Sequence, residues 1–467
     1  MLTGSRPFLF LFIVTVLAAG ASLLYLTNVA NSAGEPVSTE FPALTGTMSG
    51  EFGTLARNMV DSRVFSLSTS TPLEPDAWRT PGYPAFLAPF YALLGSFYPV
   101  LIAQVIILYL TLLLLNAMAQ KFMDRRWAFA LTLLYLLLPG TLLAVASLLT
   151  ETLFIFCFML AVYLCFFSRW QGEFVRFAIA GLLLAVATYI RPASLYIIPF
   201  FIGAYLVFFI GWGSITRRHL TALALLSVVF VAALLPWYYR NYEVFDHFSF
   251  ASTGPFVLFR QNAVQFYESL TDVSNIEARY TLLERAGFPP GPVPMDFASG
   301  AALKEVAIEV ISEHPVRYAI FHLSTFLQFF LSSGAQNYWF FAEALHPTFD
   351  PEPEPSLIQA LYPFSLPMLL TVLENHGWTL AENMFWGIIT LLMIIGLWRS
   401  PNRRLAWVLF SFTMYFALVT GPIAHARYRM PVEPFILMTA FGAASLINQN
   451  RMRGRKLFAP PELRRFD

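Results

Sequence analysis

Charged residues are scarce in this chain of 467 residues. Asp, Glu, Lys and Arg together make up 12% of the sequence, whereas hydrophobic residues make up 57% and aromatic residues 16%. The mean hydropathy is +0.61. Soluble globular domains usually contain about 25% charged residues. The composition therefore excludes an ordinary soluble protein and indicates a polytopic membrane protein.

Several common site motifs are also missing. The only two cysteines, Cys157 and Cys165, lie eight residues apart in one apolar run, and a helical rise of about 12 Å is too long for a disulfide. No HxH, HxxxH or CxxC spacing predicts a metal site made by the protein alone. The short linkers contain no Walker A, Rossmann GxGxxG or DxD motif, which excludes a nucleotide-sugar domain there. With a net charge of +1, no nucleic-acid partner is expected.

Apolar segments occupy most of the chain. A bilayer span takes about 17 to 25 residues, and the candidate spans are 8–27, 99–120, 127–149, 151–168, 176–190, 194–212, 220–238, 382–398, 405–421 and 431–447. Two more apolar runs, 318–333 and 356–373, either both cross or neither crosses, which gives ten or twelve spans. The first span is interpreted as an uncleaved anchor.

The distribution of charge predicts the topology. Most of the 29 Lys and Arg residues lie in alternate linkers and in a basic tail at 449–467. By the positive-inside rule these segments and both termini are cytoplasmic, which predicts an inner-membrane protein. The other face then carries two large loops, 28–82 and 239–317. We expect an amphipathic helix from Met48 to Met59, an interfacial helix from Tyr83 to Phe97, and a single all-α domain.

Polar residues gather at the outer ends of the predicted spans, while the middle of every span is almost free of charge. A transporter is expected to place ionisable residues near the bilayer midplane. The pattern therefore favours an enzyme that acts on a lipid headgroup at the outer interface.

Six motifs follow one another along the chain: SGEFGTLARN and WRTPGYPAFL in the first loop, then LLTETLFIF, ATYIRPASLY, LPWYYRNYEVF and HARYRMPVEPF. In this order they resemble the GT-C superfamily of membrane glycosyltransferases. Within it, the chain is similar to the branch that contains protein O-mannosyltransferases and lipid A aminoarabinose transferases. The resemblance implies a GT-C fold and transfer, with inversion, of a sugar from a polyprenyl-phosphate donor to an acceptor on the outer face.

That chemistry needs cations for the departing phosphate and a base for the acceptor hydroxyl. The candidates for binding the donor phosphate are Arg79, Arg191, Arg240, Arg260, Arg427, Tyr428 and Arg429. Candidate catalytic carboxylates are Glu51, Asp76 and Glu151. We expect Glu151 to orient the substrate or a divalent cation bridged to the phosphate, and no other cofactor. His425 is interpreted as a loop residue.

The first motif departs from the family pattern. There the family has Asp-x-x-x-Tyr followed by Ala, and in this chain Met48, Phe52 and Ala56 take those positions. Methionine cannot accept a proton, which leaves three alternatives. Glu51 has taken over the role, Glu40 supplies the carboxylate, or the chain is a degenerate member. We favour Glu51, because it is the only acid inside the motif.

The rival function is a flippase or transporter of lipid-linked sugars. The sugar is not specified by any motif, and the acceptor is a glycan, a lipid or a protein. Membrane lipids are the other expected partners.

Overall fold

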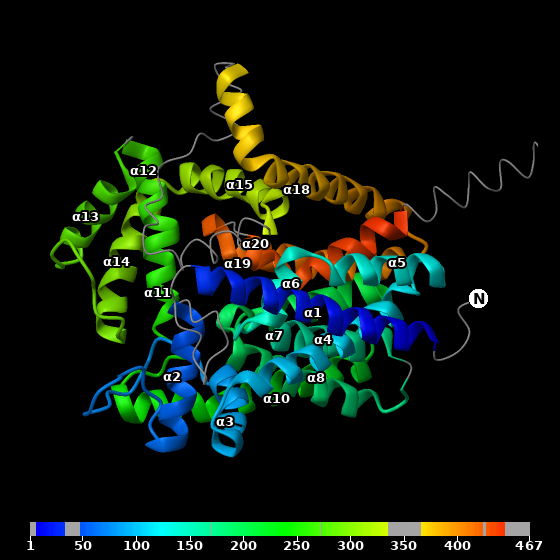
Figure 1. Ribbon diagram of the computed structural model, residues 1–467, viewed down its shortest axis with the longest axis horizontal. Helices are drawn as coiled ribbons and strands as arrows, with labels where there is room; N and C mark the ends of the chain where they lie inside the picture. The colour runs from blue at the N-terminus through cyan, green and yellow to red at the C-terminus, as the bar shows by residue number, and fades with distance from the viewer. Residues whose placement is uncertain are drawn as a thin grey trace, which may run out of the picture.

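The computed structural model describes residues 6–32, 47–168, 170–271, 273–334, 366–423 and 426–443. These residues form helices and loops and contain no strand, which confirms the all-α prediction (Figure 1). Expectations for Glu40, His425 and the tail at 449–467 concern residues outside the described ranges, as does much of the apolar run 356–373.

A bundle of apolar helices forms the larger part of the structure (Figure 1). Its helices are α1 (Arg6–Ser32), α4 (Tyr98–Ala119), α5 (Arg125–Leu136), α6 (Pro139–Ala146), α7 (Glu151–Val162), α8 (Glu173–Ile190), α9 (Ile197–Gly203), α10 (Arg217–Phe245), α18 (Leu366–Arg399) and α19 (Arg403–Thr420). A last helical segment follows from residue 433.

Five stretches of the described residues are long and apolar enough to cross a membrane. They are Arg6–Asn28, Tyr98–Ala119, Glu173–Ile190, Arg217–Phe245 and Leu380–Arg399. The pair α5 and α6 makes a sixth if it is counted as one span bent by 59°. Pro139 opens α6, and the preceding Leu138 is extended with ψ 134°, as expected before a proline.

Two of the remaining predicted spans, 151–168 and 194–212, correspond to broken helices. Helix α7 continues as the π-helical segment η1 (Tyr163–Phe167), and α9 continues as η3 (Ala204–Ile210). A 3-10 turn, η4 (Trp212–Ser214), follows η3. The sequence pattern counts each of these apolar segments as one span, whereas five or six of the described helices are both long and apolar enough to cross a membrane.

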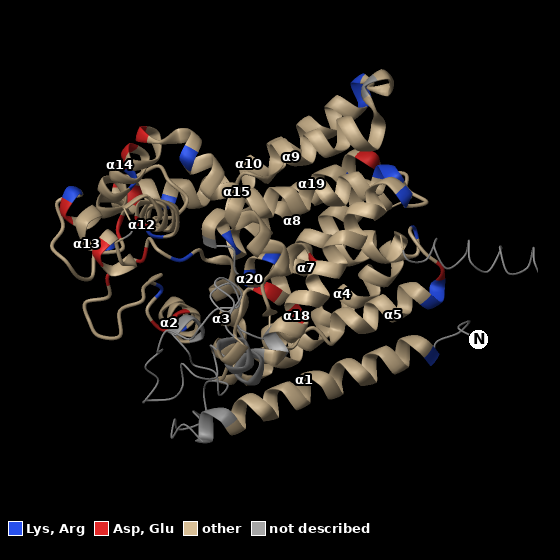
Figure 2. Cartoon of the chain, turned by 90° about the horizontal axis from the view of Figure 1, so that it is seen from above, with Lys and Arg blue, Asp and Glu red and all other residues tan. Residues whose placement is uncertain are grey.

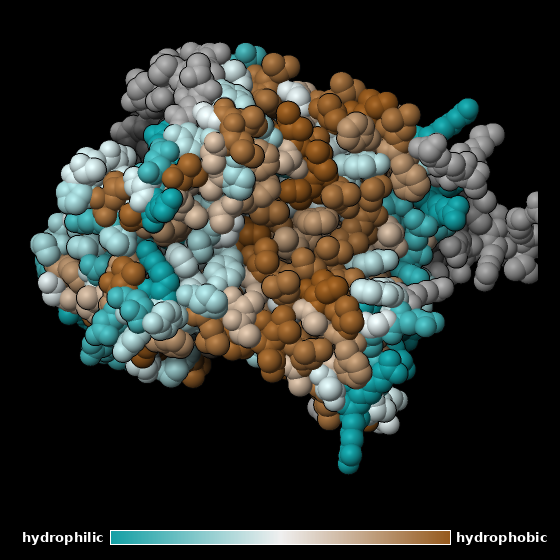
Figure 3. Space-filling view, turned by 90° about the horizontal axis from the view of Figure 1, so that it is seen from below, coloured by the Kyte–Doolittle hydropathy of each residue, from teal (hydrophilic) through white to brown (hydrophobic). Residues whose placement is uncertain are grey.

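The surface of the bundle is that of an integral membrane protein. On α4, Ile102, Ile106 and Leu110 are exposed at intervals of four residues, while Leu108 and Leu112 on another face are buried. Figure 3 shows the result as a broad hydrophobic band between polar ends. Figure 2 shows charged residues at the two ends of the bundle and a small group of them beside α7 and α20.

A second hydrophobic core lies at one end of the bundle, among the helices labelled α11 to α14 (Figure 1). They are α11 (Thr253–Val257), the π-helical η5 (Leu258–Val264), α12 (Gln265–Thr271), α13 (Asn275–Arg285) and α14 (Phe297–Glu313). Asp296 starts α14 by accepting the Ser299 N–H at 2.7 Å, an ordinary N-cap. Helix α15 (Pro315–Leu331) leads from this unit toward the bundle.

The first loop packs against this second unit. It contains α2 (Thr47–Asp61), and α3 (Gly82–Leu94) begins at its end. The Ser252 N–H donates to the Ala77 carbonyl at 2.9 Å, and the Thr253 hydroxyl donates to the Trp78 carbonyl. One backbone hydrogen bond and one from the Thr253 side chain thus join the two segments.

Candidate functional site

Helix α2 carries the first motif and confirms the predicted amphipathic helix. Leu55 and Ala56 are wholly buried, and Phe52 packs edge-on against Tyr83 with ring centroids 5.2 Å apart. Glu51 lies on the polar side, where its Oε2 accepts the Arg79 Nε–H at 2.6 Å. The two side chains are 32% and 21% exposed, so the ion pair stands at the edge of the site.

Asp76 organises the turn that follows. Its Oδ2 accepts the Arg79 backbone N–H at 2.7 Å. Burial raises the pKa of this carboxyl above its ordinary value, and hydrogen bonds from the backbone N–H groups of Arg79 and Trp78 offset part of the rise. Asp76 is therefore a carboxylate that takes up a proton more readily than an exposed aspartate.

Gly82 brings the RTPGYP turn against the end of α8. A Cβ at this position would lie 2.5 Å from the Tyr189 carbonyl carbon and 2.6 Å from the Ile190 nitrogen. Only glycine fits this approach, because both neighbouring atoms belong to backbone. The turn is thus fixed next to Arg191, the residue that ends α8.

Gln104 holds the segment before α7. Its amide Nε2 donates to the Val145 and Ser147 carbonyls at 3.1 and 2.8 Å. Its Oε1 accepts the Tyr83 hydroxyl at 2.7 Å. The buried amide connects the RTPGYP turn, α4 and the start of α7 at Glu151. Sequence analysis missed this residue, although a glutamine inside a long apolar span was a visible signal.

Glu151 lies between two arginines from distant parts of the chain. Its Oε1 is 2.8 Å from Arg191 Nη1 and also accepts the Arg427 Nε–H, while Oε2 accepts the Thr150 hydroxyl at 3.1 Å. Glu151 is 1% exposed, and the arginines are 12% and 14% exposed. The Arg191 Nη1 contact is an ion pair without hydrogen-bond geometry. Arg427 comes from α20 (Ala426–Arg429).

The three side chains leave an excess of positive charge. Two guanidiniums face one carboxylate, and the Tyr428 ring lies beside them, 5.7 Å from the Arg191 guanidinium carbon. A buried carboxylate that is paired with arginines stays ionised. The net charge of the cluster is therefore about +1, in a place with little water, which is the arrangement that binds an anion.

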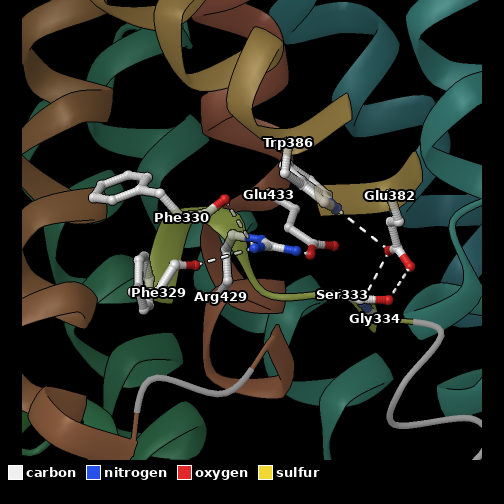
Figure 4. Close-up of polar contacts among 8 residues, drawn as sticks. All are labelled: Phe329, Phe330, Ser333, Gly334, Glu382, Trp386, Arg429 and Glu433. Carbon is white, nitrogen blue, oxygen red and sulfur yellow. Dashed lines mark hydrogen bonds and ion pairs between the residues drawn. The ribbon is translucent and has the colours of Figure 1, made fainter. Parts of the chain in front are cut away.

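Arg429 takes part in a different cluster. It is completely buried, and its Nη1 donates to the Phe329 and Phe330 carbonyls at 3.1 Å each (Figure 4). Its Nε donates to Glu433 Oε1 at 3.2 Å, and its guanidinium carbon lies 3.8 Å from the Trp386 ring centroid. Sequence analysis grouped Arg429 with Arg427, and the structure separates the two.

The other two candidate arginines are also apart from Glu151. Arg240 donates to the Asp76 carbonyl at 2.9 Å and lies over the Trp237 ring, with 4.7 Å to its centroid. Arg260 is exposed on η5. The expected residues thus divide into three sets. Glu151 lies with Arg191, Arg427 and Tyr428. Arg79, which pairs with Glu51, and Arg240 both contact Asp76, and Arg260 and Arg429 belong to neither set.

The described part of the chain has no arrangement of side chains suited to binding a metal ion. It contains no cluster of three His, Cys, Asp or Glu side chains that could hold an ion. Two guanidiniums at Glu151 Oε1 oppose the approach of a divalent cation to that oxygen. Cys157 and Cys165 are buried free thiols, which confirms that they do not pair.

A cavity of about 560 Å³ lies at the opposite end of α7. Among the residues that line it are Lys121, Phe166, His219 and Arg404. Phe166 follows Glu151 by fifteen residues, or about 22 Å of helical rise. None of the expected site residues lines this cavity.

No protein-family model and no curated protein matches the sequence. Among solved structures, the Archaeoglobus fulgidus oligosaccharyltransferase in complex with Zn and sulfate is similar to this chain at 14% identity and a TM-score of 0.45. The oligosaccharyltransferase AglB from the same archaeon, in complex with an inhibitory peptide and a dolichol-phosphate, is similar at 12% identity and a TM-score of 0.46. These matches cover 95% and 94% of this chain but 50% and 51% of the others. The chain thus spans about half their length, and a likeness at these values assigns no activity to it.

Proposed function

We propose that this protein is an inverting membrane glycosyltransferase of the GT-C type. It takes a sugar from a polyprenyl-phosphate donor and transfers it to a glycan, lipid or protein acceptor. The site would face the outer side of the inner membrane, with both termini in the cytoplasm. This orientation rests on the positive-inside rule, since Arg125, Arg217 and Arg403 begin helices at the end of the bundle away from Glu151.

The cluster of Glu151, Arg191 and Arg427 is the observation that carries the proposal. It is an anion site built from α7, the end of α8 and α20. A polyprenyl phosphate presents one phosphate at the membrane surface and an apolar tail in the bilayer. The cluster lies in an apolar bundle, where a lipid can deliver its headgroup while the tail stays among hydrophobic side chains.

The arginines would assist departure of the phosphate. When the bond between the sugar and the phosphate oxygen breaks, negative charge grows on that oxygen, and guanidinium groups already in place stabilise it. Glu151 would hold both guanidiniums in position before the donor arrives. No step is assigned to a metal, because the arginines occupy the space around the Glu151 oxygen.

Two carboxylates compete for the role of base toward the acceptor hydroxyl. Glu51 is engaged by Arg79 at 2.6 Å, whereas the half-buried Asp76 has a raised pKa. A base works best when its pKa approaches the working pH. We therefore assign proton transfer to Asp76 and the positioning of Arg79 to Glu51, and the variants Asp76→Asn and Glu51→Gln separate the two roles.

Transfer by purified protein tests the function. Protein in nanodiscs is mixed with radiolabelled polyprenyl-phosphate sugars and a membrane extract as the source of acceptor. We expect label to move from the donor to an acceptor with the wild type and with Arg217→Gln, a matched loss of charge at the other end of the bundle. Arg427→Gln should lower the rate at least about tenfold, since a hydrogen bond to a charged group contributes about 1.5–3 kcal/mol. If the same protein in sealed vesicles moves the donor across the membrane without consuming it, the protein is instead a transporter.

A further inference from the structure

We propose that Arg429 is a positioning residue, which sets the place of Arg427 by fixing α20 to the junction of α15 and α18. The inference rests on the proposed function, because it concerns the donor-phosphate site. It removes Arg429 from the set of residues that touch the donor.

The short helix α20 presents its two arginines in opposite directions. Residues two apart on a helix differ by about 200° around its axis. Arg427 accordingly meets Glu151 at the start of α7, and Arg429 meets Phe329 and Phe330 at the end of α15. A rotation of α20 that releases one arginine must therefore displace the other.

The contacts of Arg429 are those of an anchor. The side chain is completely buried. It donates hydrogen bonds to two carbonyls in the last turn of α15, where the helix dipole favours a cation. Glu433 and the Trp386 ring hold the guanidinium from two more sides (Figure 4). Because the side chain is completely buried, a donor phosphate cannot contact it without a rearrangement of the residues around it.

The same junction is held from α18. Glu382 accepts the Ser333 hydroxyl at 2.5 Å and the Gly334 N–H at 2.9 Å, and the Trp386 indole donates to it at 3.4 Å (Figure 4). Trp386 therefore contacts both Glu382 and Arg429. The end of α15, one turn of α18 and α20 form one polar unit, and this unit determines where Arg427 stands.

A binding assay tests the positioning role. The probe is a polyprenyl monophosphate without sugar, and the variants are Arg429→Met, Trp386→Phe and the control Leu397→Ala, which removes a buried side chain elsewhere on α18. We expect Arg429→Met to raise the Kd about tenfold or more. Trp386→Phe, which keeps an aromatic ring beside Arg429, should raise it less than threefold. Leu397→Ala should lower the melting temperature without a change in Kd.

Two results would overturn the proposal. One is an unchanged Kd for Arg429→Met, and the other is an equal rise for Leu397→Ala, which would reduce the effect to general destabilisation. The kcat for transfer should fall as the Kd rises, because Arg429 acts through Arg427, whose guanidinium would stabilise the departing phosphate.

A second measurement does not need a donor. The melting temperatures of Arg429→Met, Glu151→Gln and the double variant are compared in the ligand-free protein. If Arg429 places Arg427 against Glu151, the combined loss is smaller than the sum of the single losses. A strictly additive result contradicts the positioning role. Failure of the wild type to bind the probe, with a non-additive cycle, would refute the proposed function and leave the positioning role standing.

Discussion

Gly82→Ala should damage the site through one added methyl group. The new Cβ would lie 2.5 Å from the Tyr189 carbonyl carbon and 2.6 Å from the Ile190 nitrogen. Carbon atoms in contact prefer about 3.5–4.0 Å, so the RTPGYP turn and α8 must separate by about 1 Å. Overpacking of this kind costs about 1–3 kcal/mol, which lowers the ratio of folded to unfolded protein by about 5- to 150-fold.

The functional loss should exceed the loss of stability. Arg191 is the next residue after α8, so the same shift moves it relative to Glu151 and Arg79. A misplacement of about 1 Å can lower a rate about 100-fold. We therefore expect transfer per folded molecule to fall by about this factor, measured with labelled donor alongside the melting temperature.

Gly181→Ala is the matched control. Its Cβ would lie 2.4 Å from the Leu226 carbonyl oxygen, where α8 packs against α10, about 15 Å along the helix from Arg191. This variant should lose stability but keep most of its activity per folded molecule. The close approach at Gly82 does not position the site if Gly82→Ala is as stable and active as the wild type. The same conclusion follows if Gly82→Ala and Gly181→Ala lose activity equally.

Three other predictions concern the carboxylates. The pKa of Asp76 is raised in the folded protein, so ionisation of this carboxyl lowers the stability of the wild type as pH rises from about 4 through the raised pKa. The melting temperature of Asp76→Asn minus that of the wild type should therefore increase over this pH range. A decrease over the same range would show that ion pairing of Asp76 dominates. Glu151→Gln should melt at a lower temperature than the wild type, because two buried guanidiniums lose their carboxylate. Added polyprenyl monophosphate should raise the melting temperature of this variant more than that of the wild type. An equal rise in both proteins argues against binding at these arginines. Glu51→Gln should raise the donor KM through a mobile Arg79 without moving the acid limb of the pH–rate profile, whereas a lost acid limb would make Glu51 the base.

Local sequence patterns predicted a helix well where the spacing of apolar residues within that segment alone determines it. The spacing of apolar residues from Met48 to Met59 predicted α2, observed as Thr47–Asp61. The segment 127–149 was predicted as one span, and the structure bends it at Pro139. The proline was visible in the sequence, but the 59° bend depends on the packing of α5 and α6 against neighbouring helices.

The pairings within the site were not predictable from the sequence. Arg427 and Glu151 are 276 residues apart, and only tertiary packing brings α20 to the start of α7. The sequence identified both residues as polar outliers at helix ends, without indicating that they meet. The sequence also grouped Arg427 with Arg429. The helix α20, which points the two side chains in opposite directions, has only four residues and leaves no periodic pattern to read.

The central claim is that a lipid phosphate binds between Arg191 and Arg427. The most direct test is a cryo-EM structure of the protein in nanodiscs with a polyprenyl monophosphate. We expect phosphate density within hydrogen-bond distance of both guanidiniums and next to Tyr428. Phosphate density at the opposite end of α7, in the cavity lined by Lys121 and Arg404, with none near Glu151, would contradict it.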